Sequence, residues 1–189
     1  MRKYIGKAFF KVSGWTLENN PAIWSDKQVA IGFEHTSNFD AVLALALVQA
    51  IGIKNPRTLV KKELFKGPFK LFFEALGCIP VDRKAAKAIV GQMVNEFAAH
   101  EQMTLMLAPE ATRGKDGTAR QPIKTGFWQI AKAANVPIVL MYANPLTQQC
   151  GAFAKIVPSD LQADLLEIQR LYQEKGLTVV IPQKDSRLA

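Results

Sequence analysis

The sequence predicts a single α/β domain with a central, mostly parallel sheet flanked by helices. First, short apolar runs alternate with stretches of helical periodicity from residue 28 onward. Second, these runs are almost continuously apolar, as are strands that helices cover on both faces of a sheet. Third, the 189 residues are 49% hydrophobic and 21% charged, a composition that suits one folded domain and excludes a disordered chain.

The first expected element is a short basic amphipathic helix over residues 2–12, within an N-terminal segment of residues 1–14. Its basic face carries Lys3, Lys7 and Lys11, which recur at every fourth position. Its apolar face carries Ile5, Phe9 and Val12. Such a helix either rests in a lipid headgroup layer or packs its apolar face on the domain, and the sequence leaves both open.

The strands and helices of the sheet follow in alternation. We expect strands, each a short apolar run, at residues 29–34, 57–61, 78–81, 103–107 and 137–142. We expect one helix that ends near residue 51, and further helices over residues 63–76, 84–100 and 126–135. The whole chain, residues 1–189, then forms one domain in which residues 28–144 carry the motifs described below.

The C-terminal part is expected to add one more helix and one more strand. The helix covers residues 160–175, with Ser159 as its N-cap. Its apolar stripe consists of Leu161, Leu165, Ile168 and Tyr172. Residues 178–181 are apolar and β-branched enough to form a last edge strand.

The charge balance indicates an anionic partner. There are 24 Lys and Arg residues against 16 Asp and Glu residues, a formal net charge of +8. A nucleic acid, an anionic membrane surface or a phosphorylated substrate would each fit this charge. No apolar run reaches the roughly 20 residues that cross a bilayer. We expect a cytoplasmic protein, either free or peripheral on the cytoplasmic face of the membrane.

The two cysteines, Cys78 and Cys150, make neither a disulfide framework nor a zinc-binding spacing. We therefore expect inert thiols in a reducing compartment and no metal site. The phosphate-loop, dinucleotide and nucleophile-elbow motifs are also missing from the sequence. Histidine is scarce, and of the two present we expect His100 to occupy a solvated helix end.

His35 is the first candidate for chemistry, because it directly follows the first expected strand. Ligands of parallel α/β folds bind at the carboxyl ends of strands. If His35 lies in the turn and Asp40 in the first helical turn, the Asp40 carboxylate can accept the Nδ1–H and raise the basicity of Nε2. A His–Asp dyad of this kind deprotonates a hydroxyl directly. The alternative is a capping box between Ser37 and Asp40 without catalysis.

Two further polar clusters follow the fourth and third expected strands. Glu110, Thr112 and Arg113 share the loop after the fourth strand, and Arg83 follows the third. Arginine binds phosphate in a bidentate manner, and glutamate accepts a hydrogen bond from a hydroxyl. Each cluster alone also fits a solvated surface loop. Parallel strands would place these clusters and His35 on one edge of the sheet.

The stretch of residues 61–70 interleaves lysines with phenylalanines. A membrane surface suits that pattern, because cations meet headgroups while aromatic rings insert below them. Single-stranded nucleic acid suits it as well. A third interpretation is an amphipathic helix whose phenylalanines face the core.

Taken together, these clusters resemble the glycerolipid acyltransferase family, the group that contains the 1-acyl-sn-glycerol-3-phosphate acyltransferases. The family's first block is His-x₄-Asp, here His35 and Asp40. The second ends in Gly-x-Ile-x-Val-x-Arg, here residues 77–83, and the third is usually Pro-Glu-Gly-Thr-Arg, here residues 109–113 with Ala111 at the glycine position. The fourth is a Val-Pro-Ile strand start, here residues 136–138.

The resemblance implies a glycerol-3-phosphate acyltransferase-like fold and acyl transfer from acyl-CoA or acyl carrier protein to a hydroxyl of a lysophospholipid such as 1-acyl-glycerol-3-phosphate. It implies that His35 is the general base and that Asp40 orients it. It further implies that Arg83 and Arg113 hold the acceptor's phosphate.

The same resemblance implies that Glu110 and Thr112 bind the glycerol or shape its pocket. It assigns Pro137 to the acyl side of the site or to a structural role. No metal and no redox cofactor are implied, since the acyl thioester is a co-substrate. The chain resembles a compact subgroup without membrane-spanning helices.

Two alternatives stay open after the resemblance. In the first alternative, the chain is an acyltransferase that acts on a different acceptor, such as a lyso-ornithine-type lipid, a sugar lipid or another alcohol. In the second alternative, the chain is a non-catalytic basic module that binds membranes or nucleic acid. The resemblance leads us to expect no nucleic acid.

Overall fold

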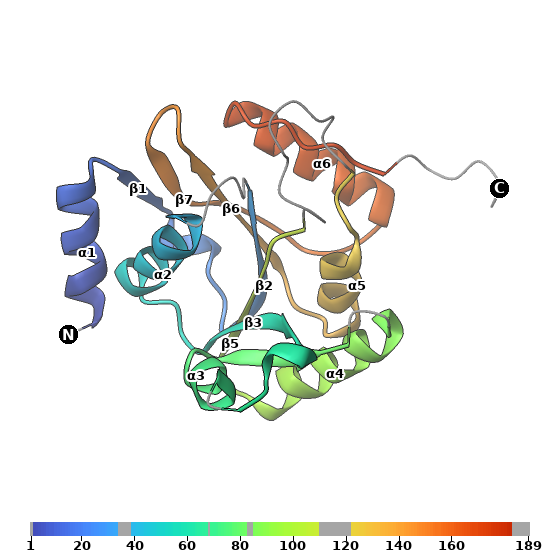
Figure 1. The fold of residues 1–189 in the computed structure, drawn as a ribbon. Coiled ribbons are helices and arrows are strands. Elements are labelled where there is room, and N and C mark those ends of the chain that lie inside the picture. Colours follow the sequence, from blue (N-terminus) through green and yellow to red (C-terminus); the bar gives the residue numbers. More distant parts are fainter. Residues whose placement is uncertain (1, 34–38, 68, 83–84, 110–121, 183–189) are drawn as a thin grey trace.

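The fold, a computed structural model, is described for residues 2–33, 39–67, 69–82, 85–109 and 122–182, and it confirms the predicted α/β class. One sheet runs through the middle of the described chain, with helices on both faces (Figure 1). Its strands are β1 (Thr16–Asn19), β2 (Lys27–Phe33), β3 (Pro56–Lys61), β4 (Cys78–Val81), β5 (Met103–Leu107), β6 (Ile138–Asn144) and β7 (Gln149–Ile156). Its helices are α1 (Arg2–Ser13), α2 (Phe39–Ile51), α3 (Phe69–Ala75), α4 (Ala86–Ala99), α5 (Gly126–Ala133) and α6 (Leu161–Glu174), with the 3₁₀ helices η1 (Pro21–Ile23) and η2 (Lys62–Leu64).

The strands are ordered β1-β7-β6-β2-β5-β3-β4. β6, β2, β5, β3 and β4 are all parallel to one another, so their carboxyl ends share one edge of the sheet. β7 turns back antiparallel to β6, and β1 runs parallel to β7. Five of the six predicted strands are the five parallel ones, whereas β1 and β7 were not predicted.

The helices form two layers. α1, α2 and α3 lie on one side of the sheet, and α4, α5 and α6 lie on the other (Figure 1). This division follows from right-handed crossovers, because the chain moves across the sheet in one direction through α2 and α3 and in the opposite direction through α4 and α5.

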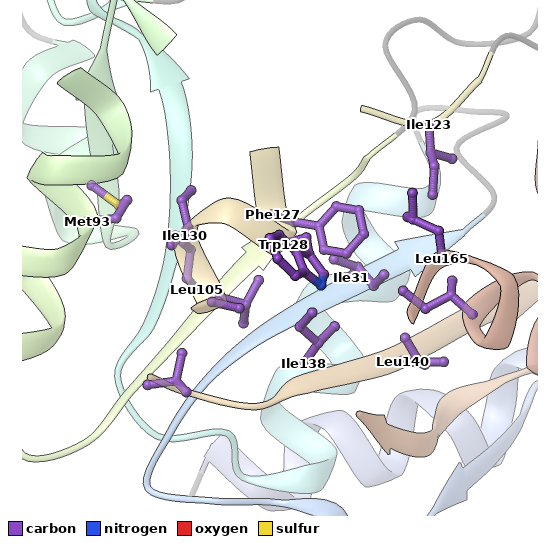
Figure 2. Packing of buried hydrophobic residues seen from close by; sticks show 14 of the residues in the cluster. Ile31, Met93, Leu105, Ile123, Phe127, Trp128, Ile130, Ile138, Leu140 and Leu165 are labelled. Carbon is purple, nitrogen blue, oxygen red and sulfur yellow. The ribbon is translucent and has the colours of Figure 1, made fainter. Parts of the chain in front are cut away.

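The larger part of the core lies between the sheet and the layer of α4, α5 and α6. Figure 2 shows the α5 side chains Phe127, Trp128 and Ile130 packed over strand residues such as Ile31 and Leu105. All five are buried. A smaller cluster on the opposite face joins α1 and α2 to β6 and β7. Burial of both faces explains why the central strands are so uniformly apolar.

The N-terminal helix packs through only part of the expected apolar face, since of Ile5, Phe9 and Val12 only Phe9 is half-buried against the core. Ile5 and Val12 are 59% and 83% exposed, whereas Phe10 is buried. Gly6 is also buried, and a Cβ at that position would overlap the backbone of Ala46 and Ala50 in α2. Because Gly6 has no side chain, α1 and α2 can approach each other closely. This contact, rather than the most apolar stripe, determines which face of α1 is buried.

The single helix expected over residues 63–76 is wrong. The chain forms η2, then a break, and then the short α3. Gly67 has a positive φ of 56° and precedes Pro68 in sequence. A residue before proline is pushed out of the helical region, and glycine tolerates the left-handed region, so the Gly-Pro pair divides the segment.

The C-terminal helix is confirmed, with a different cap and without the following strand. Asp160 is the N-cap, and its carboxyl group accepts the N–H of Ala163 at 2.9 Å. Residues 178–181 form no strand, but their backbone is held by other bonds. The Val179 carbonyl accepts from the Gln169 amide at 2.7 Å, and the Val180 carbonyl accepts from the Ile123 N–H at 2.9 Å.

A buried carboxyl group joins α6 to α5. Asp164 is 6% exposed and accepts three hydrogen bonds. The indole N–H of Trp128 and the backbone N–H of Ser159 each donate to its Oδ2 at 2.7 Å, and the Ser159 hydroxyl donates to its Oδ1 at 3.0 Å. Ser159, predicted as the helix cap, therefore serves to satisfy a buried acid.

Candidate active site

Three of the parallel strands lead directly into the motif residues. β2 ends two residues before His35, β4 ends two residues before Arg83, and β5 ends three residues before Glu110. β2 and β5 are neighbours, with Ile31 level with Leu107, and β4 lies two strands beyond β5. With about 4.8 Å between strands, the ends of β2 and β4 are about 14 Å apart. The strands that precede the three motif blocks in the sequence therefore end along one short edge of the sheet.

The structure places the backbone of Asp40 in the first turn of α2, which begins at Phe39. This is the position in which a carboxylate can reach back toward a preceding turn. His35, Arg83, Glu110, Thr112 and Arg113 lie outside the described residues. Their positions and contacts remain predictions.

Pro137 lies at the opposite edge of the sheet. It directly precedes β6, and its carbonyl accepts the N–H of Val29 near the start of β2 at 3.0 Å. β2 extends four more residues from Val29 to Phe33, so Pro137 is more than 10 Å from the carboxyl edge. This placement favours the structural role for Pro137 that the sequence left open beside an acyl-side role.

A polar cluster that the sequence did not reveal lies level with the end of β2. Phe33 is aligned with Tyr142 in β6, Tyr142 with Gly151 in β7, and Gly151 with Glu18 in β1. The Tyr142 hydroxyl donates to Glu18 Oε2 at 2.7 Å across the intervening strand. Gly151 has no side chain to fill the space between them, and a Cβ there would overlap the Glu18 carbonyl.

Lys175, just beyond α6, completes this cluster. Its ammonium donates to Glu18 Oε2 at 2.6 Å and to Oε1 at 2.8 Å, and it lies 5.2 Å from the centre of the Tyr142 ring. Burial opposes ionisation of Glu18, but the hydrogen bonds from Lys175 and Tyr142 outweigh it and lower the pKa of that carboxyl. Burial, reinforced by Glu18, raises the pKa of Tyr142.

The Glu18→Gln variant should lower the melting temperature at neutral pH, since it keeps an acceptor for Tyr142 but removes the charge that holds Lys175. The lowered pKa means that the ionised form stabilises the fold fully above the ordinary pKa of 4.5 and that this contribution is lost as the pH falls through the folded value. The difference in melting temperature between the parent and the variant should therefore become smaller below pH 4.5. Glu74→Gln, at an exposed pair 3.9 Å long, is the control. A difference that does not change with pH would contradict the prediction.

The cysteines offer no competing nucleophile. Cys78 and Cys150 are both buried and free. Burial raises the pKa of the Cys78 thiol, and it raises that of Cys150 to about 12. Since the thiolate is the reactive form, neither residue is activated at neutral pH.

An open hollow of about 350 Å³ lies beside the end of β4. Asp82 and Pro80 line it from β4 and the chain that follows, together with Lys62 of η2 and Gln92 of α4. The hollow adjoins the end of β4, the strand that precedes Arg83 in the sequence.

The Acyltransferase family model matches residues 12–143, well over half of the chain. The matched segment contains all four sequence blocks and the strands that lead into them. This chain belongs to the Acyltransferase family. β7 and α6 follow the matched segment, so the Glu18–Tyr142–Lys175 cluster links the family segment to the C-terminal helix.

Curated members of the family are similar over part of this acyltransferase-family chain. The 1-acyl-sn-glycerol-3-phosphate acyltransferases of Escherichia coli and Salmonella typhimurium are each 33% identical over 110 residues. The match covers 56% of this chain and 42% of each relative, so the chain aligns with less than half the length of these enzymes.

A solved structure supports the fold of this family member. The crystal structure of the 1-acyl-sn-glycerophosphate acyltransferase PlsC from Thermotoga maritima superposes with a TM-score of 0.60. The superposition covers 93% of this chain and 78% of that one, at 15% sequence identity. In the described part of the chain, none of the helices combines the length and the apolar character needed to cross a bilayer.

Proposed function

We propose that this chain transfers a fatty acyl group from an acyl thioester to a hydroxyl of a lysophospholipid such as 1-acyl-glycerol-3-phosphate. The single observation that supports the proposal is the shared edge: β2, β5 and β4 end on one side of the sheet, and the His-x₄-Asp, Pro-Glu-Ala-Thr-Arg and Arg83 blocks follow these strands in the sequence. The family and the names of the relatives support the reaction class.

The proposed reaction begins when Nε2 of His35 takes the proton of the acceptor hydroxyl. The resulting oxygen nucleophile attacks the thioester carbonyl, and the tetrahedral intermediate collapses with loss of the thiolate. The imidazolium then returns its proton to that thiolate, so the acid–base cycle closes without a covalent enzyme intermediate. Asp40 accepts the Nδ1–H of His35, which selects the tautomer that presents a basic Nε2 and stabilises the imidazolium.

Arg113 and Arg83 hold the acceptor's phosphate in this proposal. They follow β5 and β4, whose ends are two strand spacings, about 10 Å, apart. Two long guanidinium side chains from those positions can converge on one phosphate from opposite sides. Glu110 and Thr112 then contact the glycerol. A net charge of +8 also favours association with acyl-CoA or an acidic acyl carrier protein.

A different acceptor is the second candidate, and Ala111 is the observation that favours it. Ala111 stands where the family block usually has glycine. A Cβ at a position of close phosphate approach narrows the space for the headgroup. A lyso-ornithine-type lipid, a sugar lipid or another alcohol would then replace the phosphate-bearing acceptor.

A thiol-release assay tests the proposal and names a working acceptor. Purified protein receives acyl-CoAs of several chain lengths, or acyl carrier protein, with lysophosphatidic acid or with a phosphate-free alcohol acceptor. Thiol release that requires lysophosphatidic acid supports the first candidate, and release that requires only the phosphate-free acceptor supports the second. No acceptor-dependent release from either donor would overturn both.

The Arg113→Ala variant should weaken binding of the phosphate-bearing acceptor by about tenfold to a hundredfold, because a charged hydrogen-bonding pair is lost. KM for lysophosphatidic acid should rise by that factor while KM for the acyl donor changes little. Arg83→Ala should act in the same direction. An equal rise in both KM values would instead assign these arginines to the donor or to the fold.

A further inference from the structure

The side chain of Tyr172, in the last turn of α6, reaches the sheet where β2 ends. Its hydroxyl oxygen lies 2.6 Å from the Met141 carbonyl oxygen in β6 and 3.2 Å from the Ile31 carbonyl oxygen in β2. Tyr172 is fully buried, and Gly32, the residue after Ile31, is level with Met141. The hydroxyl therefore bridges the two strands at one level of the sheet, just before Phe33 ends β2.

The presence of two acceptors makes this contact more than the satisfaction of a buried hydroxyl. A phenolic hydroxyl carries one proton, so a single acceptor would suffice for it. A backbone carbonyl that accepts an N–H within a sheet keeps a second lone pair for a further donor. Tyr172 therefore donates mainly to Met141, the nearer oxygen, and shares its proton with Ile31. This contact ties β2 to β6 as well as α6 to the sheet.

Tyr172 is itself held from several sides. Its ring packs edge-on against Phe153 of β7, with 5.2 Å between the ring centres. Its carbonyl oxygen accepts the backbone N–H groups of Lys175 and Leu177, each at 3.0 Å. The ammonium of Lys175 in turn donates to Glu18 in β1. The hydroxyl therefore presents a fixed point to the end of β2.

The attachment of α6 to the domain does not depend on this hydroxyl. Asp164, near the start of the helix, accepts hydrogen bonds from Trp128 and Ser159. Leu165 and Ile168 are buried along the same helix. A phenylalanine at position 172 would fill nearly the same volume in the core. The hydroxyl therefore indicates a role at the end of β2 beyond packing.

We propose that Tyr172 is a positioning residue, whose hydroxyl fixes the carboxyl end of β2 and thereby the position from which His35 acts. The proposal rests on the proposed acyl transfer. His35 follows Ile31 by four residues in the sequence, and a general base must lie within hydrogen-bond reach of the proton that it takes. A displacement of about 1 Å at a reacting group can cost about a hundredfold in rate. Because α6 follows the family segment of residues 12–143, the C-terminal part of the chain supplies this positioning contact.

The Tyr172→Phe variant tests the proposal, because it removes the hydroxyl and keeps the ring. We expect kcat for acyl transfer to lysophosphatidic acid to fall about tenfold or more, while KM for that acceptor changes little. The matched control is Ser159→Ala, which also removes one hydroxyl that donates a hydrogen bond at α6, here to Asp164. The control should lower the melting temperature and leave kcat at the parent value. Melting curves of both variants show that they are folded.

Nuclear magnetic resonance of the histidine rings gives a readout that does not require activity. The chain has only two histidines, so the His100→Ala variant assigns the ring-nitrogen signals of His35 by elimination. Tyr172→Phe should shift the His35 signals. It should leave the His100 signals in place, because His100 follows α4 at the opposite edge of the sheet.

The two readouts together separate this proposal from the proposed function. A lower kcat together with shifted His35 signals supports the positioning role. Unchanged His35 signals overturn that role whatever the rate, and so does a kcat equal to that of the parent. An equal fall of kcat in Ser159→Ala also overturns it, since loss of stability would then explain the rate. No thiol release by the parent, with His35 signals still shifted in Tyr172→Phe, overturns the proposed function and supports the link between the hydroxyl and His35.

Discussion

The His35→Ala variant should lower the rate of acyl transfer by about 10²–10⁴-fold, the usual contribution of a positioned general base. The acceptor hydroxyl is a weak nucleophile at neutral pH, and the fold offers no cysteine thiolate to replace the base. Asp40→Asn should cause a loss of the same kind, because the amide presents the wrong partner to the Nδ1–H. The measurement is thiol release under acceptor saturation, with the melting temperature as a check on folding.

His100→Ala is the matched control for that experiment. His100 ends α4, which leads into the opposite edge of the sheet from the motif blocks. It is half-buried rather than solvated, with Nδ1 bonded to the Glu96 carbonyl at 2.8 Å and Nε2 3.2 Å from the Arg57 guanidinium. Its loss should affect stability and leave the rate close to the parent value. Equal rates for the parent and His35→Ala would reject His35 as the general base.

The Asp164→Ala variant should lose about 3 kcal/mol of the free energy of unfolding, the largest effect on stability that we expect. The substitution removes an acceptor shared by the Trp128 indole and by the N–H and hydroxyl of Ser159, and it leaves the buried indole N–H unpaired. A chain of this length should then melt about 10 °C lower. Calorimetry or far-ultraviolet circular dichroism would measure the change.

The Ser159→Ala variant distinguishes the contribution of the Ser159 hydroxyl from that of the Asp164 carboxyl group. That variant loses only the hydroxyl donor at 3.0 Å, and the backbone and indole bonds to Asp164 persist. It should cost about 1 kcal/mol. If Asp164→Ala were no worse than Ser159→Ala, the indole would have found another acceptor and the link between α5 and α6 would not depend on this acid.

The parallel part of the sheet was predictable because strands covered on both faces must be apolar, and Met103–Leu107 and Ile138–Asn144 are. β1 was missed because Thr16–Asn19 is short and partly polar, and β7 because Gln149–Ile156 contains Gly, Ala and Lys among few large apolar residues. Such strands are specified by the partners that they pair with, which local sequence does not record.

The N-terminal helix shows the limit of periodicity. The pattern of Ile5, Phe9 and Val12 describes where apolar groups lie, whereas Gly6 determines how closely another helix can approach. By contrast, the break at Gly67-Pro68 was visible in the sequence and outweighs the helical pattern around it. Backbone geometry, rather than hydrophobicity, therefore determines both which face of α1 is buried and where the segment between η2 and α3 breaks.

The sheet edge at which β2, β4 and β5 end was predictable, since the carboxyl ends of parallel strands share one edge, whereas the contacts of the motif residues that follow them stay predictions. The cluster beside this edge was not predictable. Tyr142 and Lys175 lie 124 and 157 positions from Glu18, and no local pattern links them. Only the pairing of β1 with β7, and of β7 with β6, brings these groups together.

The two outer strands of the sheet bear on how this chain avoids association with itself. β1 and β4 are four residues long, and Pro80 in the middle of β4 lacks an N–H to offer to another strand. Short edges and an edge proline prevent strand addition between molecules, the first step of many aggregates. The blocked edges would let molecules of this protein crowd together without joining their sheets.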